Sequence, residues 1–179
     1  MRSHGDALSN TTVATLVKNA HSELYEIRNL SVGKPAPEIA GEDIDGKPLK
    51  LSEYRGKVVY LSFWADWSQS SMAMIPIEQS LVEKMQGNPF ALLGVNADSD
   101  KGKIRELMKR EKITWRLWCD GGGNASNPGP IARQFHVSVW PTIYVIDHRS
   151  VIRHKIVGNP GSTRINSAID ALVAEALSK

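Results

Sequence analysis

The sequence contains one cysteine, Cys119, in 179 residues. A single cysteine cannot form an internal disulfide or a cysteine-rich metal site, so both are excluded. No Lys, Arg or His adjoins Cys119 to lower the pKa of its thiol, so we expect a small, partly buried strand residue there. The histidines also lack the spacing of a metal-ligand pair, so we expect no metal and no cofactor: His4, His21, His136, His148 and His154.

Long apolar runs and concentrated charge are absent as well. No stretch is long and apolar enough to span a membrane, and residues 1–10 lack the apolar core of a signal peptide. The net charge is only +3, without a basic run that would mark a nucleic-acid surface. We therefore expect a globular protein that binds no nucleic acid. It would reach a membrane only through a leader or anchor outside this sequence.

The most informative stretch is an apolar run at residues 58–63 that continues into a helical pattern. The run is rich in β-branched and aromatic residues, which predicts a strand buried on both faces. Ser68 stands at the predicted helix start, where its hydroxyl can accept from a free backbone N–H. Pro76 should kink this helix. Apolar residues follow one helix face: Met74, Ile77, Leu81, Val82 and Met85.

The N-terminal part predicts a separate helix. Its apolar residues recur at helical spacing: Val13, Leu16, Val17, Ala20, Leu24 and Ile27. We expect residues 1–31 to form an extension whose amphipathic helix packs on the domain. The alternatives are the end of a preceding domain and a dimer contact. Residues 32–179 are expected to form one domain, in which Asp45–Gly46 is the turn of a β-hairpin.

The remaining sequence alternates between strand and helix patterns. The predicted elements are strand 90–95, a helix with Ile104, Leu107 and Met108 on one face, strand 113–119, flexible loop 120–130, short helix 130–136, strands 143–147 and 151–157, and a last helix capped by Ser162 with Ile165, Ile169, Leu172, Val173 and Leu177 on one face. Asp98 and Asp100 are interpreted as turn and capping residues rather than metal ligands. This order predicts an α/β fold with a mixed central sheet.

Trp64, Ala65, Trp67 and Pro76 surround the tetrapeptide Ser68-Gln69-Ser70-Ser71. The segment resembles the active site of the thioredoxin superfamily. The resemblance is to the membrane-anchored or periplasmic thiol-disulfide oxidoreductases (the TlpA/ResA-like branch) and the related AhpC/TSA group. Their pattern is a strand, W-A-x-W-C-x-x-C, a helix, and a proline five residues after the second cysteine. Residues 32–37 and 51–57 also resemble this group, but serines occupy both cysteine positions.

The resemblance implies a thioredoxin fold, flanked by helices and preceded by the extra helix and hairpin. It implies a cis peptide bond at Pro141, facing Ser68 and Ser71 across a groove that binds an extended protein or peptide partner. Trp67, Gln69, Trp140 and Pro141 are the candidate contacts. The alternative is that both tryptophans only cover the domain surface. Because such relatives are usually exported, the resemblance suggests a periplasmic or otherwise exported protein.

Serine changes the expected chemistry. A hydroxyl is a far weaker acid than a thiol and forms no stable disulfide-like product, so Ser68 and Ser71 cannot run the family's redox cycle. No P-x-x-x-T-x-x-C motif supports peroxidase chemistry, and no G-x-S-x-G motif supports a serine hydrolase. Two hypotheses remain open. The first is a redox-inactive binding module, and the second is a thiol-disulfide oxidoreductase whose cysteines at 68 and 71 were replaced by serine.

Overall fold

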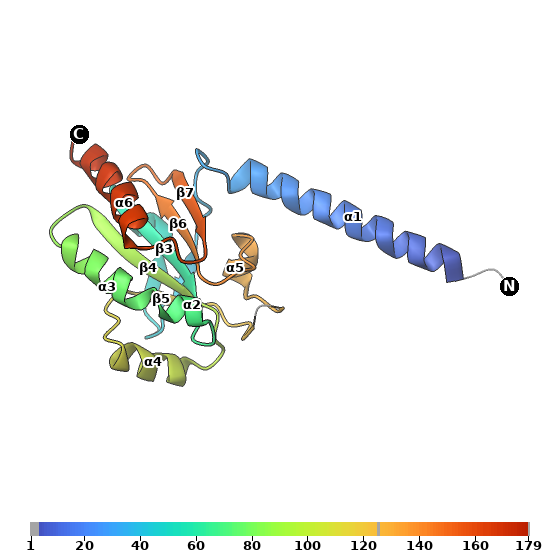
Figure 1. The fold of residues 1–179 in the computed structure, drawn as a ribbon, viewed down its shortest axis with the longest axis horizontal. Coiled ribbons are helices and arrows are strands. Elements are labelled where there is room, and N and C mark those ends of the chain that lie inside the picture. Colours follow the sequence, from blue (N-terminus) through green and yellow to red (C-terminus); the bar gives the residue numbers. More distant parts are fainter. Residues whose placement is uncertain (1–3, 125, 179) are drawn as a thin grey trace.

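The computed structural model describes residues 4–124 and 126–178, with side chains from residue 13 onward. Its centre is a five-stranded sheet in the order β5-β4-β3-β6-β7 (Figure 1). The strands are β3 (Val58–Trp64), β4 (Phe90–Asn96), β5 (Leu117–Cys119), β6 (Thr142–Ile146) and β7 (Ile152–Val157). β3, β4 and β5 run parallel, whereas β6 is antiparallel to both β3 and β7. The predicted α/β fold with a mixed sheet is therefore confirmed.

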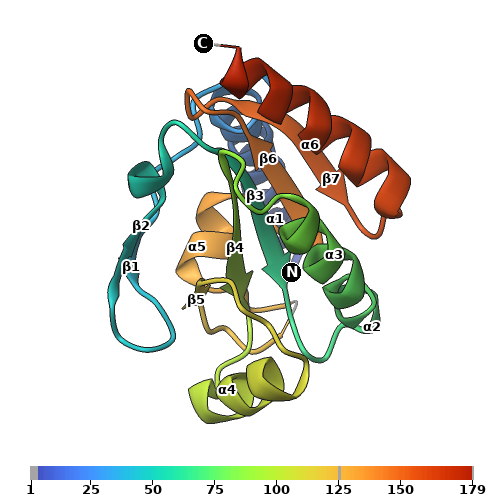
Figure 2. The same ribbon diagram turned by 90° about the vertical axis from the view of Figure 1, so that its left-hand side faces the viewer.

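Helices cover both faces of this sheet. Figure 2 shows α2 (Gln69–Met72), α3 (Ile75–Lys84) and α6 (Ser162–Leu177) on one side. The other side carries α5 (Pro130–Gln134) and the hairpin of β1 (Ala40–Glu42) and β2 (Pro48–Lys50), which confirms the predicted hairpin. A 3-10 helix (Leu51–Tyr54) links the hairpin to β3, and α4 (Lys101–Arg110) follows β4.

β3 separates the two halves of the hydrophobic core, and all of its residues are buried. Val58, Tyr60 and Trp64 pack in the cluster that contains α3 and α6. Val59, Leu61 and Phe63 pack in the opposite cluster, with α5 and the hairpin. Successive side chains of a strand point to opposite faces, so a strand between two helical layers must be apolar on both. The prediction from residues 58–63 is confirmed.

The predicted helix after Ser68 is interrupted just before Pro76, as expected. α2 ends at Met72 and α3 begins at Ile75, with Pro76 at the second position of α3. Ala73 and Met74, between the two helices, keep right-handed helical backbone angles. Pro76 has no N–H to donate to the carbonyl oxygen of Met72, four residues earlier, so the helix is broken there.

Strand 113–119 is shorter than predicted, since only Leu117–Cys119 pairs with β4. The Ile113 amide instead donates to the Met108 carbonyl oxygen (2.8 Å) beside the end of α4. The backbone of Ile113 is therefore bonded to the last turn of α4 and does not pair with β4.

The described residues of the predicted flexible loop before α5 (120–124 and 126–129) form no helix or strand, and the two ends of the loop are tied to each other. The carboxylate of buried Asp120 accepts from the amides of Ile131 (2.7 Å) and Ala132 (2.8 Å), at the start of α5. A Cβ added to Gly129 would lie 2.2 Å from the Asp120 carbonyl oxygen, so only glycine fits there. The sequence analysis did not identify Asp120 as the residue that caps α5 and thereby fixes the ends of this loop.

The last helix differs from the prediction at both ends. Ser162 is its first residue, and the cap position is Gly161, without a side-chain bond, so the predicted Ser162 cap is wrong. Leu177, on the predicted apolar face, is 63% exposed near the helix end. The other four predicted apolar residues are buried: Ile165, Ile169, Leu172 and Val173.

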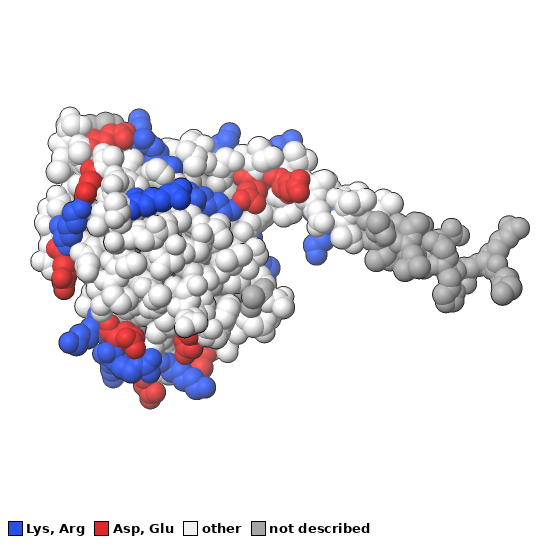
Figure 3. Space-filling model, viewed as in Figure 1, with Lys and Arg blue, Asp and Glu red and all other residues white. Residues whose placement is uncertain are grey.

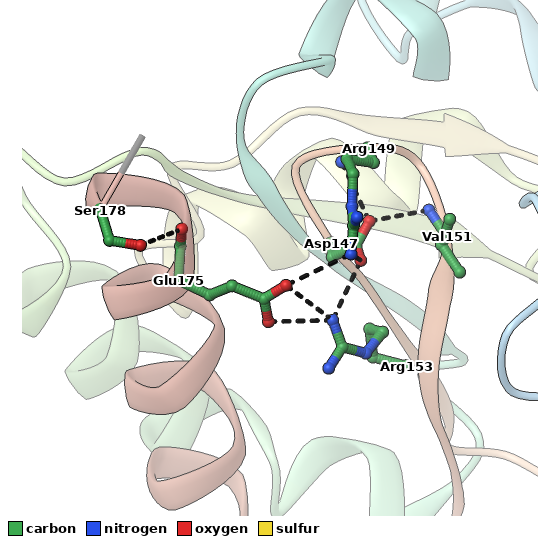
Figure 4. A network of polar contacts seen from close by, with 6 residues as sticks. All are labelled: Asp147, Arg149, Val151, Arg153, Glu175 and Ser178. Atoms are coloured by element: carbon green, nitrogen blue, oxygen red, sulfur yellow. Dashed lines mark hydrogen bonds and ion pairs between the residues drawn. The ribbon is translucent and has the colours of Figure 1, made fainter.

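Buried Asp147 organises the β6–β7 turn and joins it to α6 (Figure 4). Its carboxylate accepts from the amides of Arg149 (2.9 Å) and Val151 (3.0 Å) and from the Arg153 guanidinium (3.1 Å). Arg153 also pairs with Glu175 of α6 at 3.0 Å. Burial alone would raise the pKa of Asp147, but these donors outweigh it and lower that pKa.

α1 (His4–Asn29) projects away from the domain (Figure 1). Contacts come from its last turns, where Tyr25 stacks on His136 with ring centroids 4.8 Å apart and Glu26 pairs with Lys155. Residues 13–25 are exposed, so the prediction that this helix packs on the domain is wrong for most of its described length. Within the described residues, no helix is long and apolar enough to cross a membrane.

Candidate active-site segment

Ser68 joins two segments that are far apart in the sequence. Its Oγ accepts from the Ser71 amide at 3.2 Å, which confirms the predicted capping role. The same hydroxyl donates to the Trp140 carbonyl oxygen at 2.8 Å. Both hydrogen-bonding functions of this hydroxyl are therefore used within the protein.

The sheet brings Trp140 and Pro141 to Ser68. β6 starts at Thr142, which pairs with Phe63 near the end of β3, so the residues before β6 meet those after β3. The Thr142 hydroxyl donates to the Val139 carbonyl oxygen at 2.7 Å and holds this turn. The peptide bond between Trp140 and Pro141 is cis. The two segments that the resemblance placed opposite each other are thus adjacent.

Ser71 lies behind Ser68 and is 1% exposed. Among the described residues, its Oγ has no hydrogen-bond partner. Burying a hydroxyl without a partner costs about 1–3 kcal/mol. A thiol at the same place would cost less, because it behaves as a small hydrophobe with a weak donor. The surroundings of position 71 therefore suit a sulfur better than the oxygen that is present.

This reasoning predicts opposite effects for the two serines. Ser71→Ala should raise the free energy of unfolding by about 1 kcal/mol, because it removes an unpaired buried hydroxyl. Ser68→Ala should lower it by about 1–2 kcal/mol, because it removes a helix cap and the bond to Trp140. Urea unfolding of both variants measures these changes. An equal loss of stability in the two variants would contradict the interpretation of Ser71.

An exposed tryptophan stands over the Ser68–Trp140 junction. Trp67 is 43% exposed, and its ring meets that of Trp140 edge-on, with centroids 5.5 Å apart. Gln69, two residues after Trp67, and Val139, directly before Trp140, are exposed, whereas Trp140 and Pro141 are buried. We call this part of the surface the aromatic surface; it consists of Trp67, Gln69 and Val139, with Trp140 beneath them. In Figure 3, the face over α2 and α5 carries few charged side chains.

The four residues predicted to contact a partner thus divide into two pairs. Trp67 and Gln69 are open to solvent, whereas Trp140 and Pro141 lie beneath the surface. Sequence reasoning missed Val139, which is 48% exposed. An apolar residue directly before the Trp-Pro pair was the available signal.

Sequence reasoning also missed Glu78, a carboxyl group inside the core. Glu78 of α3 is 3% exposed, and its Oε1 accepts from the Ser62 hydroxyl of β3 at 2.7 Å. Burial raises the pKa of Glu78 to about 7, although the bond from Ser62 opposes that rise. The signal was its spacing, four residues after Met74 and three before Leu81 on the buried helix face.

Cys119 ends β5 and is partly buried, as predicted. Burial raises the pKa of its thiol, although Lys101 and Arg105 oppose that rise. Asp100 caps α4 by accepting from the amides of Gly102 and Lys103, which confirms its predicted role. No group of three or more metal-ligating side chains occurs in the part of the chain that the structure describes.

The sequence of this chain is similar to those of known proteins. Residues 32–155 match the model of the AhpC/TSA family. Thiol-disulfide oxidoreductase ResA of Bacillus thuringiensis subsp. konkukian is 25% identical over 129 residues, which cover 72% of this chain and 71% of that protein. Thioredoxin-like protein YneN of Bacillus subtilis is 25% identical over 141 residues, covering 77% and 78% of the two chains.

Solved structures share the fold. A DsbF homologue from Corynebacterium diphtheriae superposes with a TM-score of 0.69 at 24% identity, covering 78% of this chain and 87% of that one. A thiol:disulfide interchange protein from Chlorobium tepidum gives 0.67 at 20% identity, covering 80% and 98%. The chain therefore belongs to the AhpC/TSA family, in the branch of the thioredoxin superfamily that contains the thiol-disulfide oxidoreductases.

Proposed function

We propose that this protein binds an extended segment of a partner protein at the aromatic surface and does not exchange thiols with it. The observation that carries the proposal is the environment of Ser68. A hydroxyl that caps the helix and bonds to the Trp140 carbonyl oxygen occupies the position of the family's attacking thiol. An oxygen there can hold the segment's geometry but cannot form a mixed disulfide. The chain's one thiol, Cys119, lies on β5, two strands from β3.

The aromatic surface supports the binding part of the proposal. Exposed tryptophan is enriched among residues that dominate protein interfaces, because one rigid side chain buries a large apolar area. Trp67 is held in place by its edge-on contact with Trp140. A relative is named a thiol-disulfide oxidoreductase, and a disulfide in a protein segment is one substrate that such a reaction can take. A family member that keeps the binding surface but lacks the cysteine pair would still bind such a segment, without exchanging thiols with it.

Binding at this surface predicts a large effect of Trp67. Extended peptides with apolar side chains should shift the tryptophan emission of the wild-type protein, and Trp67→Ala should weaken their affinity by about tenfold or more. Leu177→Ala is the matched control, because it removes a 63% exposed apolar side chain from the far end of α6. Titration by fluorescence and calorimetry measures both variants. Equal affinities for wild type and Trp67→Ala, or no binding of any peptide, would refute the proposed function.

One observation favours the second hypothesis, an oxidoreductase whose cysteines at 68 and 71 were replaced by serine. The buried Ser71 hydroxyl has no partner among the described residues, as expected where a sulfur has given way to an oxygen. A comparison with the encoding gene separates the hypotheses. Serine codons at both positions favour the binding module, and cysteine codons favour the enzyme.

A further inference from the structure

α1 has two opposite faces with different surroundings. Ser22, Tyr25 and Glu26 form the face toward the domain, through His136 and Lys155. Their spacing of three and four residues places them on one side of the helix. A residue two positions away lies about 200° around the axis, so Leu24 points away from that side. The face opposite the domain is therefore the one that solvent covers.

That outward face is apolar over its whole described length. Five residues alternate at steps of four and three, the spacing of heptad core positions. We name them the α1 seam: Val13, Val17, Ala20, Leu24 and Ile27. The four larger side chains are 58%, 50%, 44% and 62% exposed in that order. Packing of an apolar face supplies most of the stability of a helix in a protein, so this seam would gain stability from a partner.

We propose that the partner is a second copy of this chain and that the two α1 helices form a parallel coiled coil along the seam. Charge complementarity supports this arrangement. With Val17 and Leu24 at position a, Glu23 occupies position g and Arg28 occupies position e of the next heptad. In a parallel pair, these two positions face each other across the interface. Glu23 and Arg28 are exposed, and neither has an ion-pair partner among the described residues.

The antiparallel alternative fits less well. In antiparallel pairs, positions g face g and positions e face e, so Glu23 at g would not meet Arg28 at e across the interface. An antiparallel pair therefore lacks the attractive contact between Glu23 and Arg28. Either direction leaves each domain on the outer side of its own helix, because the domain contacts the face opposite the seam, so the charge pairing decides between them.

Sedimentation equilibrium of the full chain tests the dimer. The seam is short, so the weight-average mass should rise with concentration from 19.7 kDa toward twice that value. Leu24→Asp should keep the protein at 19.7 kDa across the same range. Lys18→Glu, a charge change at an exposed position off the seam, should leave the dimer intact and is the matched control. A wild-type protein that stays monomeric up to about 1 mM, or a dimer that survives Leu24→Asp, would overturn the proposal.

Charge exchange and cross-linking test the register. Glu23→Lys should raise the dissociation constant by about tenfold, because two attractive contacts become repulsive. Adding Arg28→Glu should restore it, since the pair is then exchanged. In a Cys119→Ala background, Val13→Cys should form an intermolecular disulfide on oxidation, because equal positions meet in a parallel pair. A dimer in which Val13→Cys forms no cross-link contradicts the parallel register. Circular dichroism of each variant checks that the fold is retained.

Discussion

A double variant, Ser68→Cys with Ser71→Cys, is expected to reduce protein disulfides, whereas the wild-type protein is expected to reduce none. The structure retains what the reaction requires of the backbone. The Ser71 amide already points at the Oγ of residue 68, at 3.2 Å, and would stabilise a thiolate there. We therefore expect the first introduced thiol to titrate below the ordinary value of about 8.5. Residues one helical turn apart are also close enough for a disulfide.

The measurement is dithiothreitol-driven reduction of insulin, with alkylation rate against pH as the second readout. Turnover of the double variant should exceed that of the wild type by about tenfold or more, because the wild type has no dithiol. Ser68→Cys alone should accumulate mixed disulfides, since no second thiol resolves them. All variants carry Cys119→Ala as a common background, which removes the thiol on β5.

Two results would contradict the expectation. The first is an introduced thiol at position 68 that titrates like a free cysteine. The second is a double variant that forms no disulfide between its new cysteines. Either would mean that the segment has left the family's geometry, and the binding module would then be favoured over a replaced enzyme.

The sequence predicted features that depend on local pattern. A continuous run of β-branched and aromatic residues identified β3, and apolar residues at a spacing of 3.6 identified the buried face of α6. Ser68 was predicted as a cap because a capping bond spans only three residues. The proximity of Ser68 to Trp140 required the family resemblance, since 72 residues separate them and no local pattern encodes their contact.

The missed features depend on partners distant in the sequence. Asp120 caps α5 from eleven residues away, and Glu78 is buried because Ser62 of another element offers it a donor. A charged residue is predicted at the surface unless the sequence shows a reason for burial. A buried carboxyl needs hydrogen-bond donors, and a local pattern cannot show donors that come from a distant segment. The seam on α1 was visible as an amphipathic helix, but only the structure shows which face the domain leaves uncovered.

Glu78 should make the stability of this protein depend on pH. Burial raises the pKa of its carboxyl from an ordinary 4.5 to about 7 in the folded state. Between these values the folded state binds a proton that the unfolded state has released, so stability falls as pH rises. The stabilisation is complete below pH 4.5 and is lost once the pH passes about 7. At about 1.4 kcal/mol per pKa unit, the fall amounts to roughly 3 kcal/mol.

Urea unfolding from pH 4.5 to 8 compares the wild type with Glu78→Gln. Glutamine keeps the shape and can accept from the Ser62 hydroxyl, but it does not titrate. The free energy of unfolding of the wild type should therefore fall by roughly 3 kcal/mol relative to that of Glu78→Gln over this pH range. The pH dependence caused by all other groups is the same in both proteins and cancels in the difference. Glu83→Gln, on the exposed face of the same helix, should retain the wild-type profile. If Glu78→Gln keeps that profile as well, the buried carboxyl is not the group that binds the proton on folding.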